Sequence, residues 1–151
     1  MKRMLMTAAA AILLLAALTA AGEELPDFLA VTGISGVQAR LDAGAELASV
    51  MFREGIIDEE GPAESSDPAV VNALWEALSR VRIAGESDCF RTDWYPAVIF
   101  TLSDGTSLTV RFDWRWLETD GFTFYVLEND EDFWHLAREL YRSQYGYALS
   151  W

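Results

Sequence analysis

Cysteine and histidine are almost absent from this sequence of 151 residues, which contains one of each, Cys89 and His135. A single cysteine excludes an intrachain disulfide framework, although Cys89 could still link two chains. One cysteine and one histidine cannot build a zinc site of nitrogen and sulfur ligands within one chain. The sequence also lacks a phosphate-binding glycine loop and a nucleophilic serine turn. We therefore expect no metal and no cofactor.

Basic residues are scarce as well. Eleven lysines and arginines face 24 aspartates and glutamates, which gives a net charge of −13. Lys2 and Arg3 are two of the 11, so the chain after residue 22 has 9 basic and 24 acidic residues and a net charge of −15. This charge disfavours nucleic acid and anionic membranes as partners. The negative charge is consistent with a role in solubility, with binding of a divalent cation or with a basic protein partner.

The longest apolar run, at 8–18, is too short to span a membrane comfortably. Lys2 and Arg3 precede it and small residues follow it, as in a secretory signal peptide over 1–22. A retained N-terminal anchor is the alternative. Ala21 stands where a bacterial lipoprotein would have its lipidated cysteine. We therefore expect a secreted or extracytoplasmic protein that is not lipid-anchored and has no membrane span after cleavage.

The rest of the sequence predicts an N-terminal linker over 23–33 and a single α+β domain over 34–151. The expected order is β-β-α-β-β-β-α, an antiparallel sheet with two helices packed on one face. Leu47–Arg53 fits a strand or a helical turn, and we favour the strand. The expected strands are Ile34–Leu41, Leu47–Arg53, Trp94–Leu102, Ser107–Leu117 and Phe122–Leu127.

The last three strands are predicted to form a meander with two tight turns. Asp104-Gly105 and Asp120-Gly121 are dipeptides that favour two-residue hairpin turns. Between them, Ser107–Leu117 alternates apolar and polar side chains, which is typical of a strand with one covered face. We therefore expect one continuous strand that carries Trp114 and Trp116 on its apolar face.

Two helices are indicated by their ends. Asp67 can accept hydrogen bonds from the free amides of a first turn, Pro68 suits that turn, and Gly85 can end the helix. The acidic residues at 130–132 precede a second apolar stripe, which ends at Gly146. We expect one core that contains Val70, Leu74, Leu78, Phe112, Phe124, Leu136 and Leu140.

This succession of signals resembles small exported domains of Gram-positive bacteria, often lipoproteins, whose function is unknown. The resemblance covers roughly residues 30–145 and implies no functional residue. The signals that carry it are the Asp67-Pro68 helix start, the Tyr95–Leu102 strand, the Ser103-Asp104-Gly105 turn and the Asp120-Gly121 turn.

No group of residues identifies a catalytic centre. Asp113 and Glu118 could form a carboxylate pair like that of a glycoside hydrolase, but Asp113 lies between two arginines on the polar face, where charge pairing explains it. The acidic residues Asp58, Glu59, Glu60, Glu64 and Asp67 do not have the spacing of a calcium loop. We expect a protein that is not an enzyme. A small carboxylate-dependent hydrolase is the alternative.

Large aromatic side chains are the remaining candidates for a site. Trp94 enters the first strand of the meander, and Trp114 and Trp116 lie at the far end of the second. Antiparallel pairing would bring these ends together. The rings either fill the core or form an exposed patch that binds a protein or a carbohydrate, because tryptophan is enriched in binding hot spots. We expect a non-catalytic interaction or ligand-binding module.

The signal peptide gives the first testable prediction. The small residues at 19–22 imply cleavage after Ala21 or Gly22, so the exported protein should begin at Gly22 or Glu23. N-terminal sequencing of secreted material measures this directly. An intact Met1 in the exported pool would contradict it.

Overall fold

The computed structural model describes residues 24–55, 61–88, 95–113, 116–119 and 123–146. Within these ranges the chain forms four helices and seven strands, so the expected α+β class is confirmed. In chain order the elements are α2 (Phe28–Val31), α3 (Ile34–Asp42), β1 (Leu47–Arg53), β2 (Ala63–Ser65), α4 (Pro68–Ser79), β3 (Arg82–Ser87), β4 (Ala97–Leu102), β5 (Ser107–Asp113), β6 (Trp116–Thr119), β7 (Thr123–Glu128) and α5 (Glu131–Tyr145).

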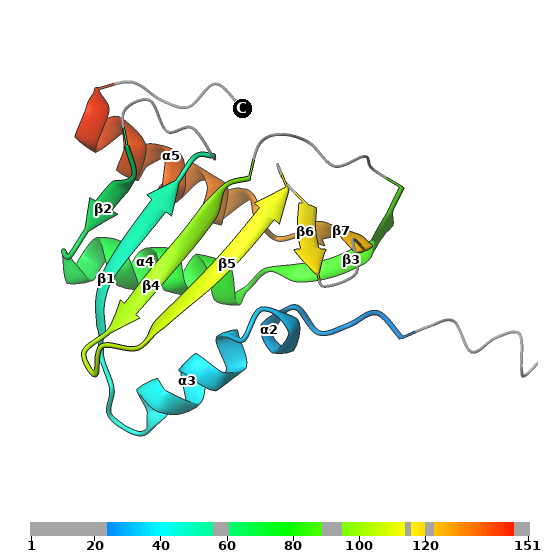
Figure 1. Ribbon diagram of the computed structural model, residues 1–151, viewed down its shortest axis with the longest axis horizontal. Coiled ribbons are helices and arrows are strands. Elements are labelled where there is room, and N and C mark those ends of the chain that lie inside the picture. The colour runs from blue at the N-terminus through cyan, green and yellow to red at the C-terminus, as the bar shows by residue number, and fades with distance from the viewer. Residues whose placement is uncertain (1–23, 56–60, 89–94, 114–115, 120–122, 147–151) are drawn as a thin grey trace, which may run out of the picture.

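The strands form one antiparallel sheet in the order β2-β1-β4-β5-β6-β7-β3 (Figure 1). β5 joins its two halves. It pairs with β4 over five residue pairs, from Ala97↔Arg111 to Thr101↔Ser107. With β6 it pairs over only two, Phe112↔Leu117 and Asp113↔Trp116.

Helices α4 and α5 lie behind β1, β4 and β5 in Figure 1 and cover that face of the sheet. The buried side chains alternate along the strands, as in a sheet with one covered face. Two indole rings make the main contacts. The Trp75 ring on α4 lies 5.2 Å from that of Phe100, and the Trp134 ring on α5 lies 4.9 Å from that of Phe112.

The start of α4 and the end of α5 form as their sequences predict. Asp67 Oδ1 accepts a 2.9 Å hydrogen bond from the Ala69 N–H, and Pro68 occupies the first turn of α4. Gly146 ends α5 with φ 80°, a left-handed conformation that favours glycine.

The expected core is confirmed except at one position. Leu74, Leu78, Phe112 and Leu140 belong to the buried cluster, and Val70 and Leu136 pack partly buried against it. Phe124 is also buried, but it lies outside that cluster. Its neighbour Tyr125 packs against the core, and successive side chains of a strand point to opposite faces.

Four helices replace the two that we expected, and the predicted element order is wrong. Residues 34–41 form α3 rather than a strand. Ile34, Val37 and Leu41 follow helical spacing, and the first two are buried. Between residues 37 and 41, apolar and polar side chains also alternate, so the same segment fits the pattern of a strand. α2 lies inside the expected linker, and its Phe28 is fully buried.

Two strands were not expected at all. β2 lies in the segment interpreted as a loop, and its three residues pair with β1. α4 ends at Ser79, before the expected stop at Gly85. Gly85 instead lies in β3, where the register against β7 shifts between Ile83 and Gly85. Such an irregularity, in a strand of mostly polar residues, leaves no apolar alternation to detect.

The predicted continuous strand Ser107–Leu117 is also wrong. β5 ends at Asp113, and Trp116 pairs back against it as the first residue of β6. Apolar and polar residues keep alternating in the sequence on both sides of the chain reversal, so their periodicity could not reveal that the strand ends at Asp113. A turn forms at Asp104-Gly105, with Gly105 at φ 83°. The Leu102 N–H donates to the Thr106 carbonyl, so the hairpin loop has the three residues 103–105 rather than the expected two. Asp120-Gly121 lies outside the described residues.

The core gives a prediction about stability. Leu74 and Phe112 are each 1% exposed, so Leu74→Ala and Phe112→Ala should each lower the free energy of unfolding by about 2–5 kcal/mol. Leu25 is 42% exposed, and Leu25→Ala should change it by less than about 0.5 kcal/mol. Denaturant titration measures all three. Equal midpoints for Leu74→Ala and Leu25→Ala would contradict the assigned core.

Candidate functional site

The tryptophans expected to form a binding patch are only partly described. Trp94 and Trp114 lie outside the described residues. Trp116 is half-buried and pairs with Asp113 on one side and Val126 on the other. Val126 is 40% exposed and lies on the same face of the sheet. Because the chain reverses after Asp113, Trp116 is not at the far end of the second meander strand, and the three-residue patch stays a prediction.

The other candidates do not come together as a catalytic site. Asp113 is fully buried, so the prediction that it lies on a solvated face is wrong. It lies at the end of β5, where the chain reverses into β6, rather than in the middle of a solvated strand. His135 is exposed on α5. The described residues contain no metal-binding group of three or more acidic, cysteine or histidine residues. Cys89, Asp58, Glu59 and Glu60 lie outside them.

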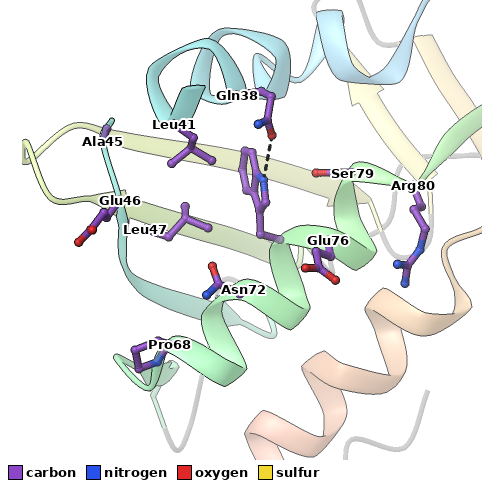
Figure 2. Close-up of a pocket in the computed structure, with 11 residues that line it drawn as sticks. Gln38, Leu41, Ala45, Glu46, Leu47, Pro68, Asn72, Glu76, Ser79 and Arg80 are labelled. Atoms are coloured by element: carbon purple, nitrogen blue, oxygen red, sulfur yellow. Dashed lines mark hydrogen bonds between the residues drawn. The ribbon is translucent and has the colours of Figure 1, made fainter. Parts of the chain in front are cut away.

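A hollow that the sequence did not indicate lies between α3 and α4, with a volume of about 800 Å³ (Figure 2). We call it the Trp75 groove. Residues from α3, from the start of β1 and from one side of α4 line it. They are Gln38, Leu41, Ala45, Glu46, Leu47, Pro68, Asn72, Trp75, Glu76, Ser79 and Arg80.

Trp75 fixes the two helices that form the groove. Its ring is 6% exposed and packs edge-on against Phe100 at an interplanar angle of 82°. Its Nε1 donates a 3.3 Å hydrogen bond to Oε1 of Gln38 on α3 (Figure 2). Buried indole N–H groups normally require such an acceptor. The contact therefore holds α3 beside α4 through a polar bridge, and Leu41 and Leu47 remain half-exposed at the hollow.

The charges around the groove are mostly negative. Glu46 and Glu76 are exposed at its margin. The third charged residue, Arg80, forms a 3.2 Å ion pair with Asp132 on α5 and points away from Gln38 in Figure 2. The arrangement is an apolar hollow with an acidic margin.

One buried polar atom at the groove lacks a partner. Ser79 Oγ is inaccessible to solvent and has no hydrogen-bond partner among the described residues. In Figure 2 the hydroxyl extends from the last turn of α4 into the groove. Most buried hydroxyls are hydrogen-bonded, so an unpaired one requires an explanation. Because solvent cannot reach Oγ, a ligand in the groove would pair with it only after the groove wall moves.

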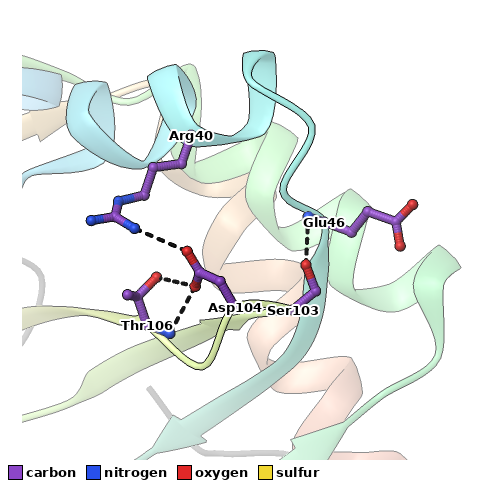
Figure 3. Close-up of polar contacts among 5 residues, drawn as sticks. All are labelled: Arg40, Glu46, Ser103, Asp104 and Thr106. Carbon is purple, nitrogen blue, oxygen red and sulfur yellow. Dashed lines mark hydrogen bonds and ion pairs between the residues drawn. The ribbon is translucent and has the colours of Figure 1, made fainter.

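The β4–β5 hairpin holds one margin of the groove in place (Figure 3). Asp104 forms a 2.9 Å ion pair with Arg40 on α3. The same carboxylate accepts hydrogen bonds from the Thr106 hydroxyl at 2.5 Å and the Thr106 N–H at 2.8 Å. The Ser103 hydroxyl accepts a 3.0 Å hydrogen bond from the Glu46 N–H, and the Ser103 N–H donates one to the Glu46 carbonyl. Glu46 is thereby fixed between α3 and β1.

The signal that could have revealed the groove is weak. The helical spacing of Ile34, Val37 and Leu41 predicts α3 once it is preferred to the alternation. Nothing in the sequence pairs Gln38 with Trp75, because 37 residues separate them.

Comparisons of the chain with models of protein families, with curated proteins and with solved structures find no match. Among the residues that the structure describes, no helix is long and apolar enough to cross a membrane.

The hairpin contacts give a prediction about pH. The Thr106 hydroxyl and N–H, followed by Arg40, hold the pKa of Asp104 below its ordinary value of 3.8. The ionised carboxylate therefore stabilises the fold above about pH 3.8, and this contribution is lost as the pH falls through the folded-state pKa. Thr106→Val should raise the pKa of Asp104 more than Arg40→Gln does. Carboxyl NMR titration measures both shifts, and the reverse order would contradict the assignment.

Proposed function

We propose that this protein is an exported, non-catalytic binding module whose Trp75 groove holds a cationic, partly apolar segment of another protein. The observation that carries the proposal is the acidic margin of Glu46 and Glu76 around an apolar hollow. Leucine or the aliphatic part of arginine would lie against Leu41 and Leu47, and a guanidinium or ammonium group would reach the carboxylates.

The charge of the whole chain supports this choice of partner. With a net charge of −13, the protein attracts cationic molecules over distance, and long-range attraction raises association rates. Arg80 does not counteract this at the groove, because Asp132 neutralises it locally. Binding should therefore weaken as salt is added.

Ser79 borders the groove with a buried hydroxyl that a ligand would meet only after the groove wall moves. The unpaired hydroxyl costs the free protein stability, because a buried polar group without a partner loses its hydration. Replacing it with alanine removes this cost. A Ser79→Ala variant that is more stable yet binds less tightly would be the signature of a hydroxyl retained for binding.

The test uses a short peptide of leucine and arginine, blocked at both ends, and a matched peptide with glutamate in place of arginine. Isothermal titration should show binding of the first peptide and little of the second. Glu76→Gln should weaken it about twofold to fivefold, the range for a partly exposed charge pair. Ser79→Ala should also weaken it, while raising the denaturation midpoint.

The control is Glu64→Gln, which removes one exposed negative charge from β2, outside the groove. It should bind the peptide as wild type does. Equal loss in Glu76→Gln and Glu64→Gln would show attraction by net charge alone and contradict the groove. Loss in Trp116→Ala, with the groove variants unaffected, would instead place the interaction at the exposed aromatic face beside Val126.

A further inference from the structure

The two halves of the sheet separate along β5, and a second hollow lies there. β5 pairs with β6 only through Phe112↔Leu117 and Asp113↔Trp116. From Arg111 back to Ser107, it has β4 as its single partner among the described residues. Figure 1 shows β6 diverging from β5 below this point, with α2 beneath the opening.

The hollow in this opening has a volume of about 620 Å³. We call it the β5–β6 wedge. It is lined by α2 and the residues just before and after it, by one edge of β5 and by the faces of β6 and β7. The lining residues are Pro26, Val31, Thr32, Thr109, Val110, Arg111, Leu117, Thr119 and Tyr125.

The edge of β5 in the wedge presents free main-chain groups. The Phe112 N–H donates to the Pro96 carbonyl at 2.9 Å, so Phe112 directs its main-chain groups toward β4. These groups alternate sides along an antiparallel strand. The N–H and C=O of Thr109 and the N–H of Arg111 therefore point into the wedge, beyond the last residue pair between β5 and β6. The C=O of Arg111 faces the Glu118 N–H, because the Phe112↔Leu117 pair requires that bond. Exposed strand edges of this kind accept an added strand.

A positive charge lies at this edge of β5. Arg111 is exposed and is the single charged residue among the described residues that line the wedge. The described residues offer it no ion pair, although acidic residues outnumber basic ones by 24 to 11 in the chain. The apolar contribution comes from α2, where Val31 is 45% exposed. An anionic group beside Arg111 and an apolar side chain against Val31 would match this surface.

The shape of the wedge determines which anion can reach Arg111. Immediately beyond Arg111, Phe112 pairs directly with Leu117, so no strand can continue between β5 and β6. A peptide that pairs with Thr109 and Arg111 must therefore end there. The end that Arg111 attracts is a C-terminal carboxylate, since an N-terminal ammonium group would be repelled.

We propose that the β5–β6 wedge binds the C-terminal segment of a partner protein as an added strand, parallel to β5, with its terminal carboxylate at Arg111. The N–H and C=O of Thr109 and the N–H of Arg111 would provide the pairing, and Val31 the apolar contact. This inference is independent of the Trp75 groove, because no residue lines both hollows.

The probe is an N-acetylated peptide that alternates valine and serine and has a free C-terminus. The first control is the same peptide with an amidated C-terminus. A second control is amidated and carries glutamate one residue from its end. Titration at physiological ionic strength should show the free acid binding about tenfold more tightly than the amide, as expected for a charge-assisted hydrogen bond.

Substitutions at Arg111 and Thr109 separate the contribution of the charge to peptide binding from that of main-chain pairing. Arg111→Met should make the free acid and the amide bind equally. Thr109→Pro removes the N–H that faces the wedge and leaves the β4–β5 pairing intact, because proline is tolerated at a strand edge. It should abolish binding of both peptides, whereas Thr109→Val should not. Circular dichroism and amide NMR spectra check that each variant is folded.

Several outcomes would overturn the proposal. Equal binding of acid and amide by the wild type would remove the role of the carboxylate. Equal binding of the free acid and the internal glutamate peptide would show that Arg111 recognises an acidic side chain rather than a C-terminal carboxylate. Unchanged binding by folded Thr109→Pro would exclude strand addition, and self-association blocked by Arg111→Met would identify a second copy of this chain as the occupant.

Discussion

The burial of Trp134 under the sheet is the contact on which the rest of the structure depends. Its ring lies 4.9 Å from that of Phe112 on β5 and 6.4 Å from that of Phe52 on β1. Its Nε1 donates a 2.7 Å hydrogen bond to Oδ2 of Asp130, which is 4% exposed. A buried carboxylate without donors and a buried N–H without an acceptor are both costly, so this bond lowers both penalties. It fixes α5 under the strand that joins the two halves of the sheet.

Both hollows lie where elements diverge, and the wedge begins directly beside this contact. Phe112 is held by Trp134 and pairs with Leu117, but the next residue of β5, Arg111, no longer pairs with β6. The wedge begins there. At the hairpin end of the sheet, Trp75 is buried on Phe100 and reaches α3 through Gln38. Leu41 and Leu47 lie half-exposed beside this bridge, and they line the groove between α3 and α4.

The elements that could be predicted from the sequence are those whose signals are local. The Asp67-Pro68 start of α4, the Gly146 end of α5 and the Asp104-Gly105 turn follow from the chemistry of single residues. β3, β2 and the reversal after Asp113 depend on pairing with distant strands, and no periodicity marks them. The Trp75 groove could not be predicted either, because α3 and α4 form it only when they pack together in the folded chain. The free edge of β5 follows from the registers of β5 with β4 and with β6, which the sequence does not indicate.

The two proposed sites would select opposite charges, and both choices are compatible with an anionic protein. The net charge of −13 acts over distance, but at physiological ionic strength charges are screened beyond about 8 Å. At contact distance the local charge decides, which is acidic at Glu76 and basic at Arg111. The β4–β5 hairpin links the sites, because Asp104 holds the groove margin and Arg111 lines the wedge. Leu108, which is 9% exposed and belongs to the buried cluster, anchors this hairpin to the core between the two sites.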